Sequence, residues 1–179
     1  NWRTLNAKSG TASAAAAVKA NAYGLGARVV VPELHAAGCR DFYVAHTREA
    51  FELLDMRGLG AISVLHGPMS DQDAACLHAA GIKPVINSIS QARGWLQVGG
   101  GACDVMVDTG MNRLGLSVSD LSDEAIRSLN VDVLLSHLVS AEEESSLNAL
   151  QLERWQEACR LLPHCRASLA NSAGIALGA

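Results

Sequence analysis

The sequence contains no cluster of basic residues, no apolar run of membrane-spanning length and no C-x-x-C pair. A net charge of −4 without a basic run argues against a nucleic acid partner. No apolar run reaches the roughly 20 residues of a membrane helix, and we expect neither a membrane span nor a secretory signal. The five cysteines are odd in number and scattered, which argues against a disulfide framework or a metal site. They favour reduced thiols in a cytoplasmic compartment.

The sequence does contain a regular alternation of short apolar runs and helical patterns. Because the chain is long enough for one well-buried core and too short to need two, we expect one domain over residues 1–179. Strands are predicted at Ala14–Lys19, Asp41–Ala45, Ile62–His66, Lys83–Ile86, Asp104–Asp108, Val131–Ser136 and Arg166–Ala170. Helices are predicted at Val29–Ala37, Thr47–Arg57, Asp71–Ala80, Ile89–Val98, Val118–Ser128 and Leu147–Leu162.

This alternation predicts an α/β fold with a parallel sheet. The strands recur at roughly 20 to 35 residues, the spacing of β-loop-α units. A complete (β/α)8 barrel usually needs about 250 residues. We therefore expect a TIM-barrel-type domain with about seven of its eight βα units present. A doubly wound open sheet is the competing architecture.

Polar side chains follow the predicted strands at their carboxyl ends, the edge where the active sites of barrels gather. A lysine, an arginine, several histidines and a serine on one rim suit an anionic ligand that carries a carbonyl group. Taken singly, each is better explained as a helix cap or a solvated surface residue, and it is their shared position that favours a site. The set comprises Lys19 and Tyr23 after the first strand, His46 and Arg48 after the second, His66 at the end of the third, Asn87 and Ser88 after the fourth, Asp108, Thr109 and Arg113 after the fifth, Ser136 and His137 after the sixth, and Asn171 and Ser172 after the seventh.

Four stretches of the sequence resemble successive signatures of the alanine racemase family. They read "AVKANAYGLGA", "DTGMNRLGL", "LSHLVSAEE" and "SLANSAG", and the resemblance runs from Val18 to Gly174. It implies a barrel that binds pyridoxal 5'-phosphate (PLP), followed by a β-rich domain, in a homodimeric enzyme. It further implies interconversion of L- and D-alanine, which supplies D-alanine for peptidoglycan. No metal is implied.

The resemblance also implies a role for each candidate residue. Lys19 would form the Schiff base with PLP and act as a base on one face of the substrate. Arg113 would grip the substrate carboxylate and contact the phenolic oxygen of PLP. His137 would pack against the cofactor ring, with a satisfied core histidine as the rival interpretation. Tyr23, Asn171 and Ser172 would bind the cofactor, with the Tyr23 hydroxyl and Ser172 on its phosphate.

Two departures of the sequence from the family pattern bear on the mechanism. Met106 stands where many members have a lysine that becomes carbamylated and steadies the arginine. Arg113 must then be held by another group, or more loosely. The family's second base is a tyrosine of the β domain, which lies beyond the sequence given, so we expect these 179 residues alone to show no racemisation.

Two alternatives stay open. The first is a non-catalytic PLP-binding carrier of the same barrel type, although the lysine motif of that family reads more like "AVSKT". The second is an inactive piece of a racemase. The motifs do not fix the substrate either, because racemases that use serine or a broader set of amino acids share them.

Overall fold

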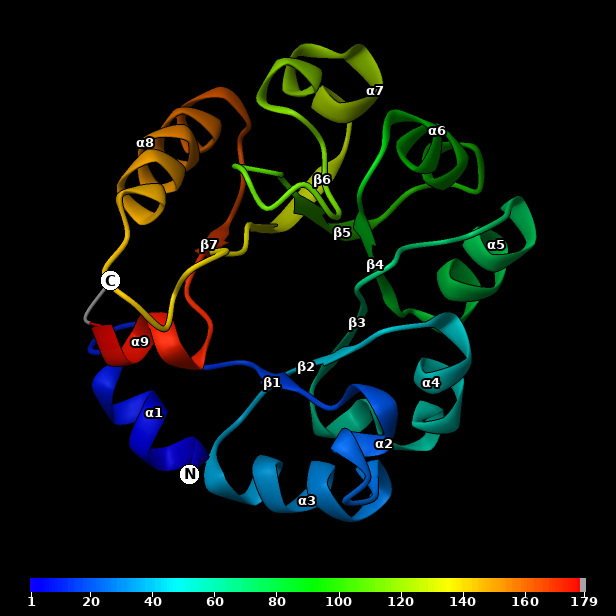
Figure 1. Cartoon of the computed structure of the whole chain (residues 1–179). Helices are drawn as coiled ribbons and strands as arrows, with labels where there is room; N and C mark the ends of the chain where they lie inside the picture. The colour runs from blue at the N-terminus through cyan, green and yellow to red at the C-terminus, as the bar shows by residue number, and fades with distance from the viewer. Residues whose placement is uncertain (178–179) are drawn as a thin grey trace. The chain divides into compact units, whose positions relative to one another are not determined.

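The computed structural model describes residues 1–177 of the chain. The contacts divide the chain into two compact units, Asn1–Pro84 and Val85–Ala179. Seven strands are hydrogen-bonded to one another in chain order, from β1 to β7, and each neighbouring pair is parallel (Figure 1). The second unit begins within β4, so every strand pair lies inside one unit.

The first unit begins with a short helix and then alternates strands with helices. Phe42 and Val44 in β2 and Ile62 and Val64 in β3 are buried, as expected of apolar residues in short parallel strands. Helices α3, α4 and α5 lie on one face of these strands (Figure 1). The elements are α1 (Trp2–Lys8), β1 (Ala16–Ala17), α2 (Lys19–Tyr23), α3 (Ala27–Ala37), β2 (Asp41–Val44), α4 (Thr47–Glu52), the 3-10 helix η1 (Leu54–Leu59), β3 (Ala61–Val64), α5 (Asp71–Ala80) and β4 (Lys83–Ile86).

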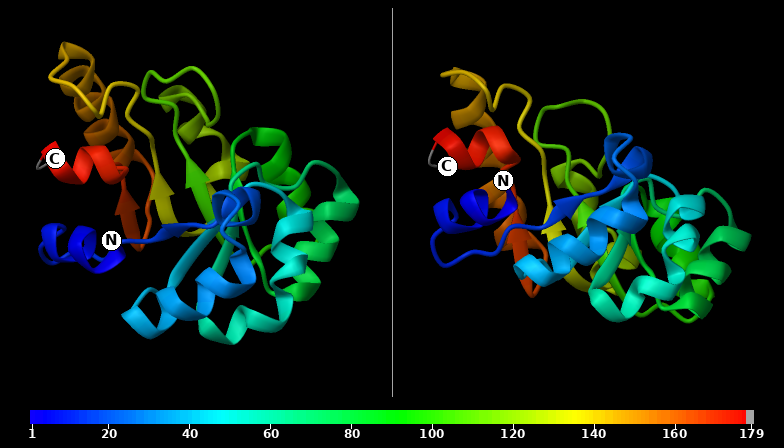
Figure 2. Two further views of the ribbon diagram at one scale, coloured as in Figure 1. Left: turned by 60° about the horizontal axis from the view of Figure 1, so that its bottom comes forward. Right: turned by 90° about the horizontal axis from the view of Figure 1, so that it is seen from below.

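The second unit repeats this arrangement from the end of β4 onward. Strands β5, β6 and β7 point the same way, so their carboxyl ends lie at one edge (Figure 2). Helices α6, α7 and α8 lie on one face of these strands (Figure 1). The elements are α6 (Ile89–Gln97), β5 (Ala102–Met106), the 3-10 helix η2 (Val118–Ser122), α7 (Glu124–Arg127), β6 (Asn130–Leu135), α8 (Ser146–Leu161), β7 (Arg166–Ser168) and α9 (Ser172–Leu177).

The order of the strands and the face on which the helices lie decide between the two predicted architectures. A doubly wound sheet reverses its strand order once and carries helices on both faces, whereas a β/α barrel keeps chain order and carries helices on one face. Each unit shows the second pattern. Within residues 1–177, no helix is long and apolar enough to cross a lipid bilayer.

Several predicted boundaries were wrong. The first strand is only two residues long, so Lys19 begins a helical turn and does not end a strand. The helix predicted at Thr47–Arg57 changes to a 3-10 helix after Glu52. The helix predicted at Val118–Ser128 is broken at Asp123, whose extended backbone and side-chain bond to Ala125 N start a new helix. Helix α1 escaped prediction because none of its residues is buried, and such a helix shows no apolar stripe.

Candidate active site

Lys19 opens a single turn of left-handed helix. Ala20, Asn21 and Ala22 have φ/ψ values of 51/46°, 53/48° and 54/47°, and Tyr23 has a φ of 55°. These angles lie close to the left-handed helical minimum, which costs an L-residue roughly 1–2 kcal/mol relative to a right-handed turn. Four successive non-glycine residues in this region constitute local strain, and such strain concentrates at functional sites.

Side chains from inside and outside the turn hold it in place. The Glu49 carboxylate accepts a hydrogen bond from Ala20 N at 2.8 Å and another from Ala45 N at 2.7 Å. The side chain of Asn21 accepts one from Ala27 N at 2.8 Å, at the start of α3. The turn is therefore fixed both to the end of β2 and to the helix that follows it.

The two predicted site residues on this turn are accessible. Lys19 is half-buried and the Tyr23 side chain is 65% exposed. Across residues 1–177, no hydrogen bond or ion pair engages the Lys19 amine or the Tyr23 hydroxyl. Both polar groups are therefore free to meet a ligand.

Arg113 lies on a closed loop after β5. Leu116 N donates to Met106 O at 2.9 Å and Asp108 N donates to Leu116 O at 2.8 Å, which closes the base of the loop. Asp108 Oδ1 accepts hydrogen bonds from three successive backbone N–H groups, those of residues 110, 111 and 112, at 2.9, 2.9 and 3.1 Å. One carboxylate thus shapes the segment that leads to Arg113.

Met106 lies beneath the Arg113 loop, at the position where the resemblance implies a lysine. Met106 packs under Gly115, where a Cβ atom would lie 2.9 Å from Met106 Cγ. Gly115 has a φ of +115°, which a larger residue rarely adopts. The Arg113 side chain is exposed and has no hydrogen-bond or ion-pair partner among residues 1–177. Within the described residues the Arg113 side chain is thus not held by another group of the chain.

A buried network of neutral groups lies beneath this loop. Ser136 Oγ donates to Val107 O at 2.8 Å and lies 2.8 Å from Thr109 Oγ1. Because each hydroxyl has one proton, Thr109 donates to Ser136 and accepts from Gln151 Nε2, which lies 3.1 Å away. Gln151 Nε2 also donates to His137 O at 3.0 Å. The side chain of Gln151, 2% exposed, therefore joins the loops after β5 and β6.

The remaining predicted residues follow β6 and β7. His137 is half-buried directly after β6 and is fixed through its carbonyl. Asn171 Oδ1 accepts a hydrogen bond from Gly174 N at 2.9 Å, so Asn171 caps α9. Ser172 is exposed at the start of α9, and the first N–H groups of a helix have no acceptor within it. The predicted residues thus form two groups, Lys19 with Tyr23 on the first unit and the others on the second.

The chain matches the family described as "Alanine racemase, N-terminal domain" over residues 1–179. The chain belongs to this family. An alanine racemase of Rhodospirillum rubrum is 41% identical over 191 residues, which cover 99% of this chain and 51% of that protein. One of Rhizobium meliloti is 39% identical over 189 residues, covering 100% and 50%. The chain therefore spans about half the length of these relatives.

A solved structure supports the same assignment. The crystal structure of alanine racemase from Bartonella henselae, with covalently bound pyridoxal phosphate, superposes with a TM-score of 0.86 at 34% identity. The likeness covers 97% of this chain and 52% of that chain. The predicted (β/α)8 barrel-type fold, with seven βα units present, is confirmed.

Sequence patterns did not single out two residues that position the candidate site of this alanine racemase family domain, Glu49 and Gln151. Glu49 stands at the third position of α4, where an acidic residue is ordinary. Gln151 interrupts the apolar positions of α8, and that interruption was the one available signal for it.

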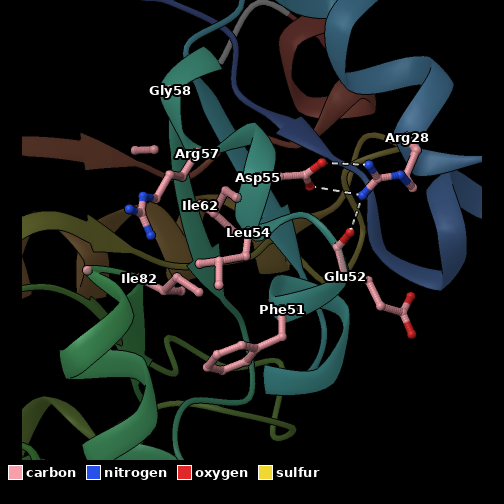
Figure 3. A pocket seen from close by; sticks show the side chains of 12 residues that line it. Arg28, Phe51, Glu52, Leu54, Asp55, Arg57, Gly58, Ile62 and Ile82 are labelled. Carbon is pink, nitrogen blue, oxygen red and sulfur yellow. Dashed lines mark hydrogen bonds and ion pairs between the residues drawn. The ribbon is translucent and has the colours of Figure 1, made fainter.

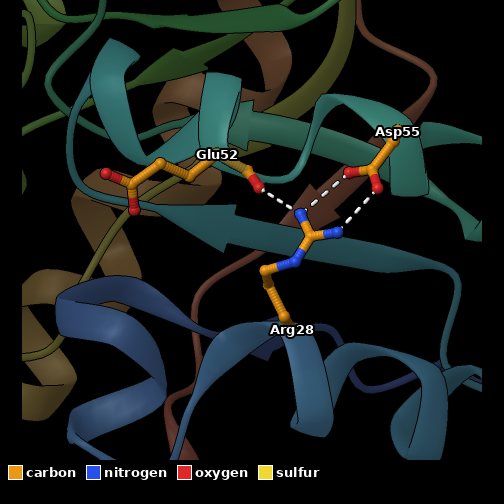
Figure 4. A network of polar contacts seen from close by, with 3 residues as sticks. All are labelled: Arg28, Glu52 and Asp55. Carbon is orange, nitrogen blue, oxygen red and sulfur yellow. Dashed lines mark hydrogen bonds and ion pairs between the residues drawn. The ribbon is translucent and has the colours of Figure 1, made fainter.

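A cavity of the first unit is lined by residues other than Lys19 and Tyr23. It has a volume of about 960 Å³, and Phe51, Leu54 and Ile82 are among the residues that line it (Figure 3). On its wall Arg28 donates to both carboxylate oxygens of Asp55, at 2.9 and 2.7 Å, and to Glu52 O at 2.7 Å (Figure 4). The hydrogen bond from Arg28 lowers the pKa of Asp55. This pair links α3 to η1 and has a structural role.

Proposed function

We propose that the chain is the PLP-binding barrel of an alanine racemase, and that Lys19 binds the cofactor covalently. The observation that carries this proposal is the unengaged Lys19 amine at the start of a strained left-handed turn. The proposal draws further support from the named relatives at about 40% identity and from the PLP bound in the Bartonella henselae enzyme. Residues 1–179 are proposed to form one domain.

The residues present fit the cofactor's chemistry. An aldehyde needs a nucleophilic amine, and the Lys19 amine has no competing partner within the described chain. A phosphate needs hydroxyl and N–H donors, which Tyr23, Ser172 and the first amides of α9 offer. When bound, PLP supplies an electron sink that acidifies the α-hydrogen of an amino acid.

The chain's own residues would then bind the substrate and move its proton. The exposed Arg113 guanidinium holds the substrate carboxylate through two parallel hydrogen bonds. The Lys19 amine, once the substrate's own amine has displaced it from the cofactor, would take or return the proton at Cα on one face. His137 and Asn171 complete the cofactor site. We place the opposite base outside residues 1–179, and we infer a cytoplasmic homodimer that supplies D-alanine for peptidoglycan.

Cofactor capture tests the central claim. The protein is mixed with PLP and reduced with borohydride, and the adduct is mapped by mass spectrometry. The sequence has three lysines, Lys8, Lys19 and Lys83, so the other two serve as internal controls. We expect the label on Lys19 and its loss in Lys19→Ala. A label spread evenly over the three lysines would contradict the assignment.

Arg113→Lys tests the substrate role. A single ammonium cannot reproduce the two-point grip on a carboxylate. In a protein that also contains the β-rich domain implied by the resemblance to the family, we expect the KM for alanine to rise by at least tenfold while the Kd for PLP changes little. Equal losses in both would make Arg113 a cofactor or folding residue. PLP on Lys19 without any alanine turnover by that protein would support the carrier alternative.

A further inference from the structure

We infer that Glu49 is the positioning residue of the Lys19 turn. Its carboxylate holds the backbone directly after Lys19 in the left-handed form and so fixes where the lysine amine starts. The inference rests on the proposed attachment of PLP to Lys19 and adds to it a residue from a different element.

The geometry is a two-point bridge. Oε1 of Glu49 accepts from Ala20 N at 2.8 Å, and Oε2 accepts from Ala45 N at 2.7 Å and more weakly from His46 N at 3.4 Å. Glu49 and Ala20 are 29 residues apart in sequence. A half-buried carboxylate thus joins the first left-handed residue to the end of β2 by charge-assisted hydrogen bonds.

Ala20 N has its acceptor outside the turn. Within the turn, Ala22 N donates to Val18 O at 2.8 Å and Gly24 N donates to Ala20 O at 3.0 Å. The Ala20 N–H has its bond to Glu49 instead. Since a left-handed turn of non-glycine residues is unfavourable by itself, an anchor at its first residue shifts the local equilibrium toward it.

Helix capping does not account for this contact. At the third position of α4, a glutamate ordinarily reaches back to the backbone N–H groups that precede the helix, which Oε2 does here. The bond from Ala20 to Oε1 contributes nothing to that cap. Bridging both sites requires two acceptor oxygens on a side chain as long as that of glutamate. Glutamine has the length but only one acceptor oxygen, and aspartate has two oxygens on a shorter side chain.

The experiment measures the rate at which PLP becomes attached to Lys19, by borohydride trapping at timed intervals. Glu49→Gln retains the length but has one acceptor oxygen, and Glu49→Asp retains the charge but is one methylene shorter. We expect both to slow labelling of Lys19 by at least tenfold. Hydrogen exchange of residues 19–24, measured without PLP, should become faster in the same variants.

Two controls separate positioning from general effects. Glu52→Gln removes a carboxylate of the same helix, one that pairs with Arg48 and not with the Lys19 turn. Ser70→Ala removes the cap of α5, where Ser70 Oγ accepts from Asp73 N at 3.1 Å, and so imitates a lost cap elsewhere in the unit. Both should label Lys19 at the wild-type rate.

The outcomes are distinct. If Glu49→Gln labels Lys19 no more slowly than Ser70→Ala, the inference is overturned. Labelling by Glu49→Asp at the wild-type rate would also overturn it, because charge alone would then suffice. If the unaltered protein does not label Lys19 at all, the proposed function fails, and the exchange measurement still shows whether Glu49 holds the turn.

Discussion

The two units hold their candidate site residues by opposite means. In the first, Lys19 precedes a strained backbone turn, held in part by an exposed contact from one carboxylate of α4. In the second, Arg113 lies on an exposed loop in which Asn112 is the one non-glycine residue with a positive φ, above a largely buried set of neutral hydrogen bonds centred on Gln151. The lysine is therefore positioned by backbone conformation, whereas the arginine loop is anchored from below and its tip stays free.

This difference makes the two units respond differently to substitution. A buried polar group that loses its partner costs about 1–3 kcal/mol. Strain in an exposed turn is a cost that the folded state already carries, so its relief should stabilise the protein. Opposite signs are therefore expected at the two sites.

The largest effect is expected for Gln151→Ala. This substitution removes the donor to Thr109 and His137 and the acceptor of Val139 N, which lies 2.9 Å from Gln151 Oε1. Since Gln151 and Thr109 are buried and the other two bonds are partly buried, the free energy of unfolding should fall by about 2–4 kcal/mol. Urea denaturation measures it, with the exposed Gln156→Ala on the same helix as control.

A loss below about 0.5 kcal/mol, the range of an ordinary surface substitution, would contradict the claim that Gln151 anchors the loops. A loss of similar size in Gln156→Ala would assign the effect to helix α8 in general. Either result would remove the contrast between the Arg113 loop, anchored by buried neutral groups, and the Lys19 turn.

Local sequence signals were enough to locate the strands, but they did not reveal the left-handed turn after Lys19 or the role of Gln151. Buried runs such as Phe42–Val44 and the family motifs located the strands and Lys19. The left-handed turn could not be predicted, because positive φ is expected of glycine and the turn's own residues, "ANAY", contain none. Gln151 contacts Thr109 across 42 residues of sequence, a distance that no local pattern reports.

An intermediate effect of the opposite sign is expected for Ala20→Gly. Glycine adopts the left-handed region without the steric cost that alanine meets there, so the free energy of unfolding should rise by about 0.5–1 kcal/mol. Ala75→Gly, at an exposed position of the right-handed α5, should instead lose about 1 kcal/mol. Thermal or urea unfolding of the two variants gives the comparison.

Equal destabilisation by both glycines would show that the Lys19 turn carries no strain. The backbone that follows Lys19 would then be no more strained than an ordinary right-handed helix. A stabilised Ala20→Gly that also labels Lys19 more slowly with PLP would show that the strain serves to hold the lysine in its reactive position.

The smallest effect concerns pH and the exposed Arg28–Asp55 pair. The hydrogen bond from Arg28 lowers the pKa of Asp55 below its unfolded value of about 3.9. The pair's contribution is therefore present above that value and is lost as pH falls through the lower folded pKa. Asp55→Asn should be slightly less stable than the unaltered protein at pH 7 and equal to it in strong acid.

Salt and the second unit complete this test. Because both side chains of the pair are more than half exposed, at 55% and 64%, 1 M NaCl should shrink the difference at pH 7. The groups that hydrogen-bond to the Gln151 side chain carry no charge, and the nearby Arg154 guanidinium donates to Thr109 O and makes no bond to Gln151. The loss in Gln151→Ala should therefore be the same across this pH range and at either salt concentration. A Gln151→Ala loss that follows pH as Asp55→Asn does would mean that a titrating group supports the arginine loop, and the contrast between a charged anchor and a neutral one would have to be abandoned.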